Sequence, residues 1–145
     1  MNTISKGRLG YNIVEWYFLQ NNYDIYVPLL ENTKIDLITV KNNNLLKFQI
    51  KTFIYEKGYK KLPVRKVSHN QGQYKISKYT KKDIDYFIGV DVEERDIYIV
   101  PIDLIEKYSS SISISKLQKY KNNFTQLEPY DGNIISGEDN IGEPC

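Results

Sequence analysis

The chain has little of several residue types from which functional sites are often built. Its one cysteine is Cys145, so an internal disulfide and a metal site made of cysteines are excluded. Its apolar runs are short and interrupted, so no segment is expected to span a membrane. Residues 1–6 also lack the apolar stretch of a secretory signal. These absences together lead us to expect an intracellular protein.

Positive charge is concentrated in the middle of the chain. The net charge is only +2, but residues 47–82 carry eleven basic side chains and one acidic one, a balance of +10. Residues 83–145 have a balance of −8. A basic region of this density inside a folded domain favours a polyanionic partner. The alternative is a solvated, lysine-rich loop whose charge is balanced by the acidic final third.

The size and composition predict one folded domain. The chain has 145 residues, of which 41% are hydrophobic, enough to form a core. We expect the domain to occupy residues 1–130. Residues 131–145 are rich in glycine, aspartate and asparagine, and we expect them to form a flexible tail.

The first half of the chain predicts a helix followed by an antiparallel meander. Apolar residues repeat at helical spacing over 6–20, which predicts a helix that the following two asparagines end. This buried stripe consists of Leu9, Ile13, Trp16 and Tyr17. Strands are expected over 24–30, 34–40 and 45–55, with a turn of three asparagines at 42–44.

The second half is less regular. Residues 57–77 are polar and basic, and we expect a long loop or an irregular hairpin, which in a compact domain is usually functional. Thr80 and Asp83 resemble a capping box and predict a helical turn over 81–85. The remaining expected elements are strands over 87–90 and 96–101, a helix over 102–108, an edge strand or linker over 109–115, and a weak helix over 116–124.

One strand face singles out a candidate site. Lys47, Gln49 and Lys51 share one face of the strand over 45–55, and the apolar residues share the other. Asp36 lies in a neighbouring, mostly apolar strand, where an unpaired carboxylate would be costly. A carboxylate, an amide oxygen and an ammonium group thus come close together. This combination favours a site that binds a cation and an anion at once, as phosphodiester hydrolysis requires.

Several oxygen atoms near this face suit a hard cation such as Mg²⁺. They belong to the Asp36 carboxylate, the Gln49 amide and the backbone carbonyl of Ile50. Glu15 adds a carboxylate if the helix packs across the sheet, and Lys51 projects into the same cleft. The alternatives are an exposed ion pair between Asp36 and Lys51, contributing about 0–1 kcal/mol, and an ordinary solvent-exposed position for Glu15.

Four segments in order give the chain a resemblance to a known family. They are Lys-Gly-Arg-Leu-Gly at 6–10, Lys-Ile-Asp-Leu-Ile at 34–38, Phe-Gln-Ile-Lys-Thr at 48–52, and Tyr-Thr-Lys-Lys-Asp-Ile-Asp-Tyr-Phe at 79–87 leading on to 96–103. The chain resembles the PD-(D/E)XK nuclease superfamily. Within it, the chain is most similar to the group I intron-encoded homing endonuclease branch with a Gln-x-Lys motif. Each motif is weak alone, and their order makes the resemblance specific.

The resemblance implies an α/β fold with a restriction-endonuclease-like core, in which a central mixed β-sheet is flanked by helices. It also implies Mg²⁺-dependent hydrolysis of DNA phosphodiesters, with Mn²⁺ as a substitute ion. By position, Asp36 matches the metal-binding aspartate and Lys51 the catalytic lysine. Gln49 matches the acidic position, which this branch often fills with glutamine.

Two positions depart from the family pattern. The usual glutamate of the first helix would fall at Tyr11, and Glu15 lies one turn later on the same face. Ile35, and not proline, directly precedes Asp36. With Gln49 neutral, the site has at most two carboxylates, so we expect weak metal binding and a high Mg²⁺ requirement.

The resemblance makes double-stranded DNA the expected partner, in the cytoplasm or at the nucleoid. Phosphate contacts are expected from basic side chains, namely Lys6, Arg8, Lys47, Lys57, Lys60, Lys61, Arg65, Lys66, Lys75 and Lys78. Side chains suited to base edges are those of Arg65, His69, Asn70, Gln71 and Gln73.

A dimer or tetramer is expected, because each subunit of such a nuclease holds one site and a double-strand break needs two. Ile112 and Ile114, in the serine-rich segment, mark one candidate interface. Three other functions compete with a homing endonuclease. They are a restriction-like or Holliday-junction-resolving nuclease, a catalytically decayed DNA-binding module on the same fold, and a protein-interaction module whose basic loop docks an acidic partner.

Overall fold

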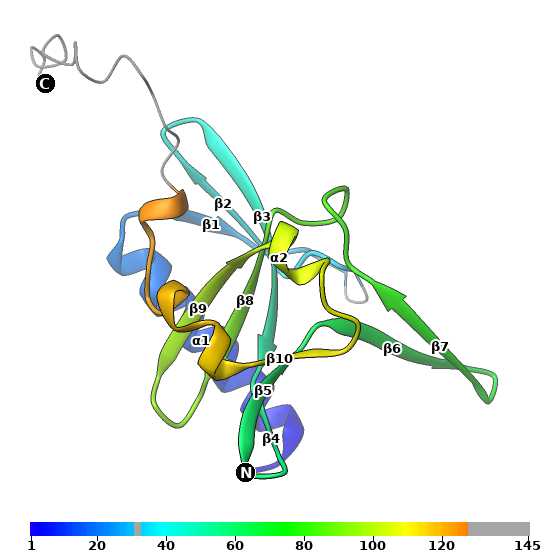
Figure 1. The fold of residues 1–145 in the computed structure, drawn as a ribbon. Helices are drawn as coiled ribbons and strands as arrows, with labels where there is room; N and C mark the ends of the chain where they lie inside the picture. Colours follow the sequence, from blue (N-terminus) through cyan, green and yellow to red (C-terminus); the bar gives the residue numbers. More distant parts are fainter. Residues whose placement is uncertain (31–32, 128–145) are drawn as a thin grey trace, which may run out of the picture.

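A mixed β-sheet forms the centre of the protein in a computed structural model that describes residues 1–30 and 33–127. Its strand order is β1-β2-β3-β8-β9. The strands are β1 (Asp24–Tyr26), β2 (Leu37–Lys41), β3 (Asn44–Thr52), β8 (Tyr86–Asp91) and β9 (Asp96–Pro101). Neighbours run antiparallel except β3 and β8, which are parallel. The central mixed sheet of the expected α/β fold is therefore confirmed (Figure 1).

Helix α1 (Thr3–Gln20) packs on one face of this sheet (Figure 1). The Asn2 side chain caps its start by accepting a hydrogen bond from the Ser5 N–H at 2.8 Å. The helix ends at Asn21, and Asn22 has a φ of 63°, in the left-handed region that asparagine tolerates. The helix predicted over 6–20 is thus confirmed, with an earlier start.

The buried side of α1 differs from the predicted stripe. Trp16 is 58% exposed, whereas Gly10, Val14 and Phe18 are buried against the sheet. A Cβ at Gly10 would lie 2.8 Å from Cγ2 of Thr52, so glycine lets the helix approach β3 closely. Its hydrophobicity and spacing predicted that Trp16 would be buried. The close approach at Gly10 instead turns another side of the helix toward the sheet and leaves the indole at the surface.

The opposite face of the central sheet is covered by a smaller sheet and a short helix. The smaller sheet has the order β10-β5-β4, with β4 (Ile54–Glu56), β5 (Tyr59–Pro63) and β10 (Ser111–Ser113). Helix α2 (Ile102–Ile105) adds to this layer. Residues of β8 alternate between the two cores, with Ile88 facing the α1 side and Phe87 facing Leu62 and Ile112. The sheet is thus flanked by helix α1 on one face and by helix α2 with the smaller sheet on the other.

The basic segment over 57–77 forms two hairpins. The first joins β4 to β5, and the second joins β6 (Arg65–Asn70) to β7 (Gln73–Lys78). The two central residues of a type I′ hairpin turn both need a positive φ. In the first hairpin these are Lys57 (54°) and Gly58 (83°), and in the second they are Gln71 (52°) and Gly72 (80°). Strands β6 and β7 form a separate two-stranded ribbon that projects from the body of the protein (Figure 1).

Several predicted boundaries are corrected. The strand predicted over 24–30 ends at Tyr26, and the one over 34–40 begins at Leu37, which leaves Asp36 just before it. The strand over 45–55 is interrupted at Phe53, between β3 and β4. The strands predicted over 87–90 and 96–101 are confirmed as β8 and β9.

The predicted helical turn over 81–85 is present as a single turn over 81–83, in which the Asp83 and Ile84 N–H groups donate to the Thr80 carbonyl at 2.9 and 3.2 Å. The Asp83 carboxylate does accept a hydrogen bond from the Thr80 N–H at 2.9 Å, as a capping contact would. The chain then leaves the turn, because Ile84 is fully buried and the Asp85 N–H donates to the Lys47 carbonyl at 2.8 Å.

The C-terminal elements are shorter than predicted. The helix over 102–108 ends at Ile105, and the candidate helix over 116–124 is replaced by short 3₁₀ turns. Ile112 is 1% exposed and belongs to the core, so the interface predicted at this residue is wrong. The predicted tail, 131–145, lies outside the described residues. In the described parts of the chain, no helix has the length and apolar character needed to cross a membrane.

Candidate active site

A cleft of about 740 Å³ opens beside α1. It is bounded by the first turns of that helix, by the connection between β1 and β2, and by the end of β3. Four residues predicted to act in catalysis or metal binding line it, namely Glu15, Asp36, Ile50 and Lys51. They come together because β2 and β3 pair antiparallel, with Leu37 opposite Phe48, so that Asp36 reaches the end of β3.

Three hydrogen bonds hold Asp36 at the cleft. Its N–H donates to the Phe48 carbonyl at 2.8 Å, and its carboxylate Oδ2 accepts from the Ile50 N–H at 2.9 Å. Its backbone carbonyl accepts from the Tyr11 hydroxyl at 2.7 Å. Asp36 lies just before β2, yet its N–H and its carboxylate both bond to the backbone of β3. These bonds fix the position of the carboxylate.

Tyr11 stands where the resemblance led us to expect a glutamate. Burial, followed by the negative charge of Asp36, raises the pKa of the Tyr11 phenol above its ordinary value of 10.0. The Glu15 charge adds to this rise, and Arg8 opposes it. The phenol is therefore protonated at neutral pH and remains a hydrogen-bond donor. Asp36, Glu15 and Arg8 therefore all lie within electrostatic reach of the Tyr11 phenol.

Gln49 is buried beside the cleft and is not among the residues that line it. Its side chain is 7% exposed, and its amide oxygen Oε1 has no hydrogen-bond partner among the described residues. Its Nε2 donates to the Ile50 carbonyl at 3.3 Å. A buried amide oxygen without a partner is costly, so Gln49 has an unmet capacity to bind a donor or a cation. The alternation of polar and apolar residues in this strand did not predict the burial of Gln49, because that burial depends on the parallel neighbour β8.

The acidic groups of the site are few. Within residues 1–30 and 33–127, no three His, Cys, Asp or Glu side chains are grouped so that they could hold a metal. Among the described residues, the carboxylates that line the cleft are those of Asp36 and Glu15, so a cation there would also need neutral oxygens. This agrees with the small number of carboxylates in the motifs.

Comparison with known proteins decides the family. A family model described as PD-(D/E)XK endonuclease matches residues 1–131. The chain belongs to the PD-(D/E)XK endonuclease family. A solved structure, that of the bacterial homing endonuclease I-Ssp6803I, has a TM-score of 0.80 at 19% sequence identity and covers 99% of this chain and 100% of its own. At that identity the likeness establishes the fold. Curated protein sequences give no significant match.

Membership of the PD-(D/E)XK endonucleases confirms the resemblance and makes the chain a nuclease. The matched range contains Asp36 and the run Gln49-Ile50-Lys51, which the order of the motifs leads us to expect at the positions for which the family is named. The sequence did not reveal the contact between Tyr11 and Asp36. The only feature of the sequence that indicated this contact was the tyrosine at the position of the expected glutamate.

Three lysines expected to contact phosphates are bound to carboxylates in this endonuclease. Lys60 contacts Asp91 at 2.7 Å and Glu93 at 3.5 Å. Lys61 contacts Glu56 at 3.2 Å, and Lys6 contacts Glu93 at 3.8 Å. The Asp91 side chain is only 4% exposed, so Lys60 is needed to neutralise a buried charge. The structure therefore favours other basic residues for contact with DNA.

The β6–β7 ribbon presents polar and basic side chains to solvent. Gln71, Gln73, Lys75 and Lys78 are exposed, and Arg65 is half-buried at the base. Lys66, His69 and Asn70 were also predicted to contact DNA, but their side chains lie outside the described part of the structure. Among the other expected contacts, Arg8 lines the cleft, Lys57 is exposed in a turn, and Lys47 donates to the Lys82 carbonyl at 3.4 Å.

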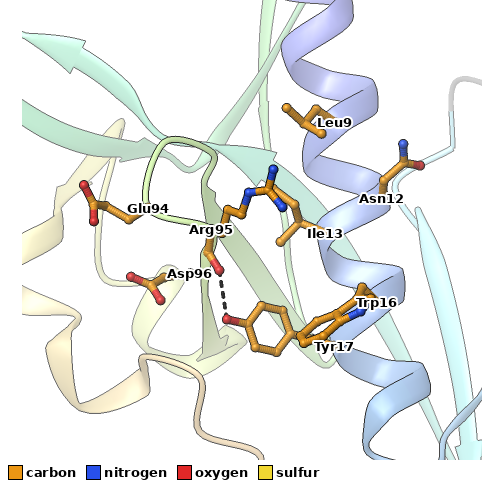
Figure 2. A pocket seen from close by; sticks show the side chains of 8 residues that line it. All are labelled: Leu9, Asn12, Ile13, Trp16, Tyr17, Glu94, Arg95 and Asp96. Carbon is orange, nitrogen blue, oxygen red and sulfur yellow. Dashed lines mark hydrogen bonds between the residues drawn. The ribbon is translucent and has the colours of Figure 1, made fainter.

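A second hollow, of about 480 Å³, lies on the other side of α1 from the cleft. Figure 2 shows Trp16 and Tyr17 of the helix facing the turn between β8 and β9, where the Tyr17 hydroxyl donates to the Arg95 carbonyl at 2.8 Å. Asp96 of this hollow is paired with Lys121 at 3.3 Å. None of its lining residues is a predicted site residue.

Proposed function

We propose that this chain is a metal-dependent endodeoxyribonuclease of the homing endonuclease type, built as one nuclease domain over residues 1–130. The observation that carries the proposal is the convergence of Glu15, Asp36, Ile50 and Lys51 in one cleft, next to the unpartnered amide oxygen of Gln49. The solved structure of a bacterial homing endonuclease with the same fold supports this function over other nucleases.

The residues of the cleft fit a divalent cation such as Mg²⁺, with Mn²⁺ as a substitute. Oxygen atoms are the ligands that Mg²⁺ prefers. They are available here from the carboxylates of Asp36 and Glu15, the Ile50 carbonyl and the Gln49 amide, whose oxygen lacks a hydrogen-bond partner among the described residues. When bound, such a cation would supply Lewis-acid polarisation of the scissile phosphate.

The side chains around this site have separate tasks in the proposal. Lys51 brings an ammonium group into the cleft, where it stabilises the negative charge that develops on the phosphate during hydrolysis. Tyr11 and the Ile50 N–H keep Asp36 in place. Arg8, at the mouth of the cleft, attracts the neighbouring phosphates.

The β6–β7 ribbon supplies the wider contact with duplex DNA. A two-stranded ribbon is narrow enough to enter the major groove, and this one projects from the nuclease body (Figure 1). Lys75 and Lys78 then contact phosphates, while Gln71 and Gln73 at its tip reach base edges.

Cleavage of supercoiled plasmid with Mg²⁺ or Mn²⁺ tests the proposal. We expect metal-dependent nicking by the native chain, and a loss of about 10²-fold or more in Asp36→Ala and Lys51→Ala. Matched controls are Asp24→Ala on β1 and Lys107→Ala after α2, both exposed and outside the cleft. The controls are expected to cleave at the native rate.

Two results would favour the competing functions. If the native chain does not cleave, and all four variants keep its salt-sensitive DNA binding, the protein is a DNA-binding module on a nuclease fold. Equal affinity for DNA and for an unrelated acidic protein would instead favour a protein-interaction module.

A further inference from the structure

The connection between β1 and β2 exposes apolar side chains that the fold does not bury. Val27 is 57% exposed, Leu29 is 97% exposed and Leu30 is 74% exposed. Single exposed apolar residues are common, but a cluster on one loop marks an interaction site. The same connection ends at Asp36, so the cluster and the site carboxylate belong to one segment of chain.

This apolar loop forms part of the wall of the catalytic cleft. Val27, Pro28 and Leu30 line the cleft together with Asp36 and Lys51. A DNA strand whose phosphate reaches Lys51 must therefore lie against these side chains. Leu29 is not among the lining residues, and its almost complete exposure places it at the outer rim of the loop.

The position of the loop determines what can cover it. A second protein seated on Val27 and Leu30 would close the cleft and keep the phosphate away from Lys51. The substrate is the one occupant that covers the loop and still fills the cleft. The apolar surfaces that duplex DNA offers next to a phosphate are the faces of its bases and the thymine methyl groups.

We propose that Leu29 acts as a wedge that inserts between base pairs beside the scissile phosphate and unstacks that step. The inference rests on the proposed function, because it takes the cleft to be the place of DNA cleavage. Leucine is one of the side chains that other proteins use to kink DNA in this way. The ring of Pro28 fixes its own φ directly before Leu29, which stiffens the loop that carries the wedge.

Two properties of the nuclease follow from the wedge. Bending of the duplex at the cleaved step brings the phosphate deeper toward Asp36 and Lys51. Steps that unstack easily, such as pyrimidine–purine steps, are cleaved in preference to stiff ones, even where no side chain reads the bases.

The test compares an intact duplex with a duplex that is already open. Both span a cut site mapped from plasmid cleavage, and the second has an abasic position next to the scissile bond. We expect Leu29→Ser to cleave the intact duplex about tenfold more slowly than the native chain, and the open duplex at the native rate. Leu29→Met keeps a long apolar side chain and is expected to cleave both duplexes normally.

Leu19→Ser is the matched control, because Leu19 is 58% exposed on α1 and does not line the cleft. A fluorescent base analogue at the cut step is expected to brighten when the native chain binds, and not when Leu29→Ser binds. The wedge is refuted if Leu29→Ser cleaves both duplexes at the native rate or slows equally on both. If the native chain cleaves neither duplex, the proposed function itself fails, and the wedge fails with it.

Discussion

Tyr11 illustrates at the scale of a single residue how this endonuclease departs from its family pattern. Its hydroxyl donates to the Asp36 carbonyl, so the first helix supports the proposed metal ligand through a hydrogen bond. We expect Tyr11→Phe to keep the packing of the ring but to loosen Asp36, because the hydrogen bond to its backbone carbonyl is lost. Cleavage at subsaturating Mg²⁺ should fall by about tenfold, as for other residues that orient a metal ligand.

Tyr17→Phe is the matched control for Tyr11→Phe. Tyr17 lies on the same helix and also donates to a backbone carbonyl, that of Arg95, but in the hollow on the other side of α1. Equal losses of activity in the two variants would show that the hydroxyl of Tyr11 acts only through the stability of the helix.

Gln49 determines the expected metal requirement. With two carboxylates among the described residues of the cleft, the native enzyme should need millimolar Mg²⁺, since affinity follows the number of charged ligands. Gln49→Glu adds a carboxylate where an unpartnered amide oxygen now lies, and should lower the half-saturating Mg²⁺ concentration by about tenfold. Both values come from cleavage rates measured across a Mg²⁺ titration.

Gln20→Glu controls for the added charge, because Gln20 is exposed at the end of α1 and outside the cleft. Its Mg²⁺ requirement should equal that of the native chain. Saturation of native cleavage at micromolar Mg²⁺ would contradict the weak metal site.

At the scale of elements, the β6–β7 ribbon is expected to set the salt dependence of DNA binding. Lys75 and Lys78 are exposed, and each phosphate contact releases counterions from the duplex. We expect Lys75→Gln and Lys78→Gln each to reduce the slope of log affinity against log salt by about 0.9. The measurement is fluorescence anisotropy of a labelled duplex at several salt concentrations. The control Lys116→Gln, outside the ribbon, should leave the slope unchanged. If Lys75→Gln or Lys78→Gln also leaves the slope unchanged, the lysine that was replaced does not contact DNA.

The same ribbon shows where sequence reasoning reached its limit. The strands of the central sheet were predictable because each has a buried face and so an alternating or apolar pattern. Strands β6 and β7 have no such pattern, since Val67, Tyr74 and Ile76 are exposed along with the lysines. The two hairpin turns were indicated only by Gly58 and Gly72, which have positive φ.

The site was more predictable than the ribbon. Asp36, Lys51 and Glu15 share the cleft as the strand pairing and the helix position indicated. The burial of Gln49 depends on the parallel strand β8, with Gln49 opposite Phe87, and this is a contact between distant parts of the chain. Trp16 was misplaced for a similar reason, because the close approach of Gly10 to Thr52 sets the rotation of the helix.

At the scale of the whole molecule, a double-strand break requires more than the single cleft that each chain carries. We propose a dimer or tetramer, although the interface predicted at Ile112 is buried in the core. Sedimentation equilibrium should give a mass of two or four chains at the concentration of the cleavage assay. Linear product should then appear without accumulation of the nicked form. A monomer that yields only nicked plasmid would contradict this assembly.

The path of the chain between β3 and β8 has a consequence for how such an enzyme diverges. These strands are neighbours in the central sheet, yet both hairpins, β4–β5 and β6–β7, are inserted between them in sequence. Lengthening the ribbon therefore only enlarges a loop whose ends the sheet already holds together, and doubling such a loop costs only about 0.6 kcal/mol. The proposed reach toward DNA could thus be lengthened, shortened or exchanged by insertion and deletion without moving the strands that hold the cleft.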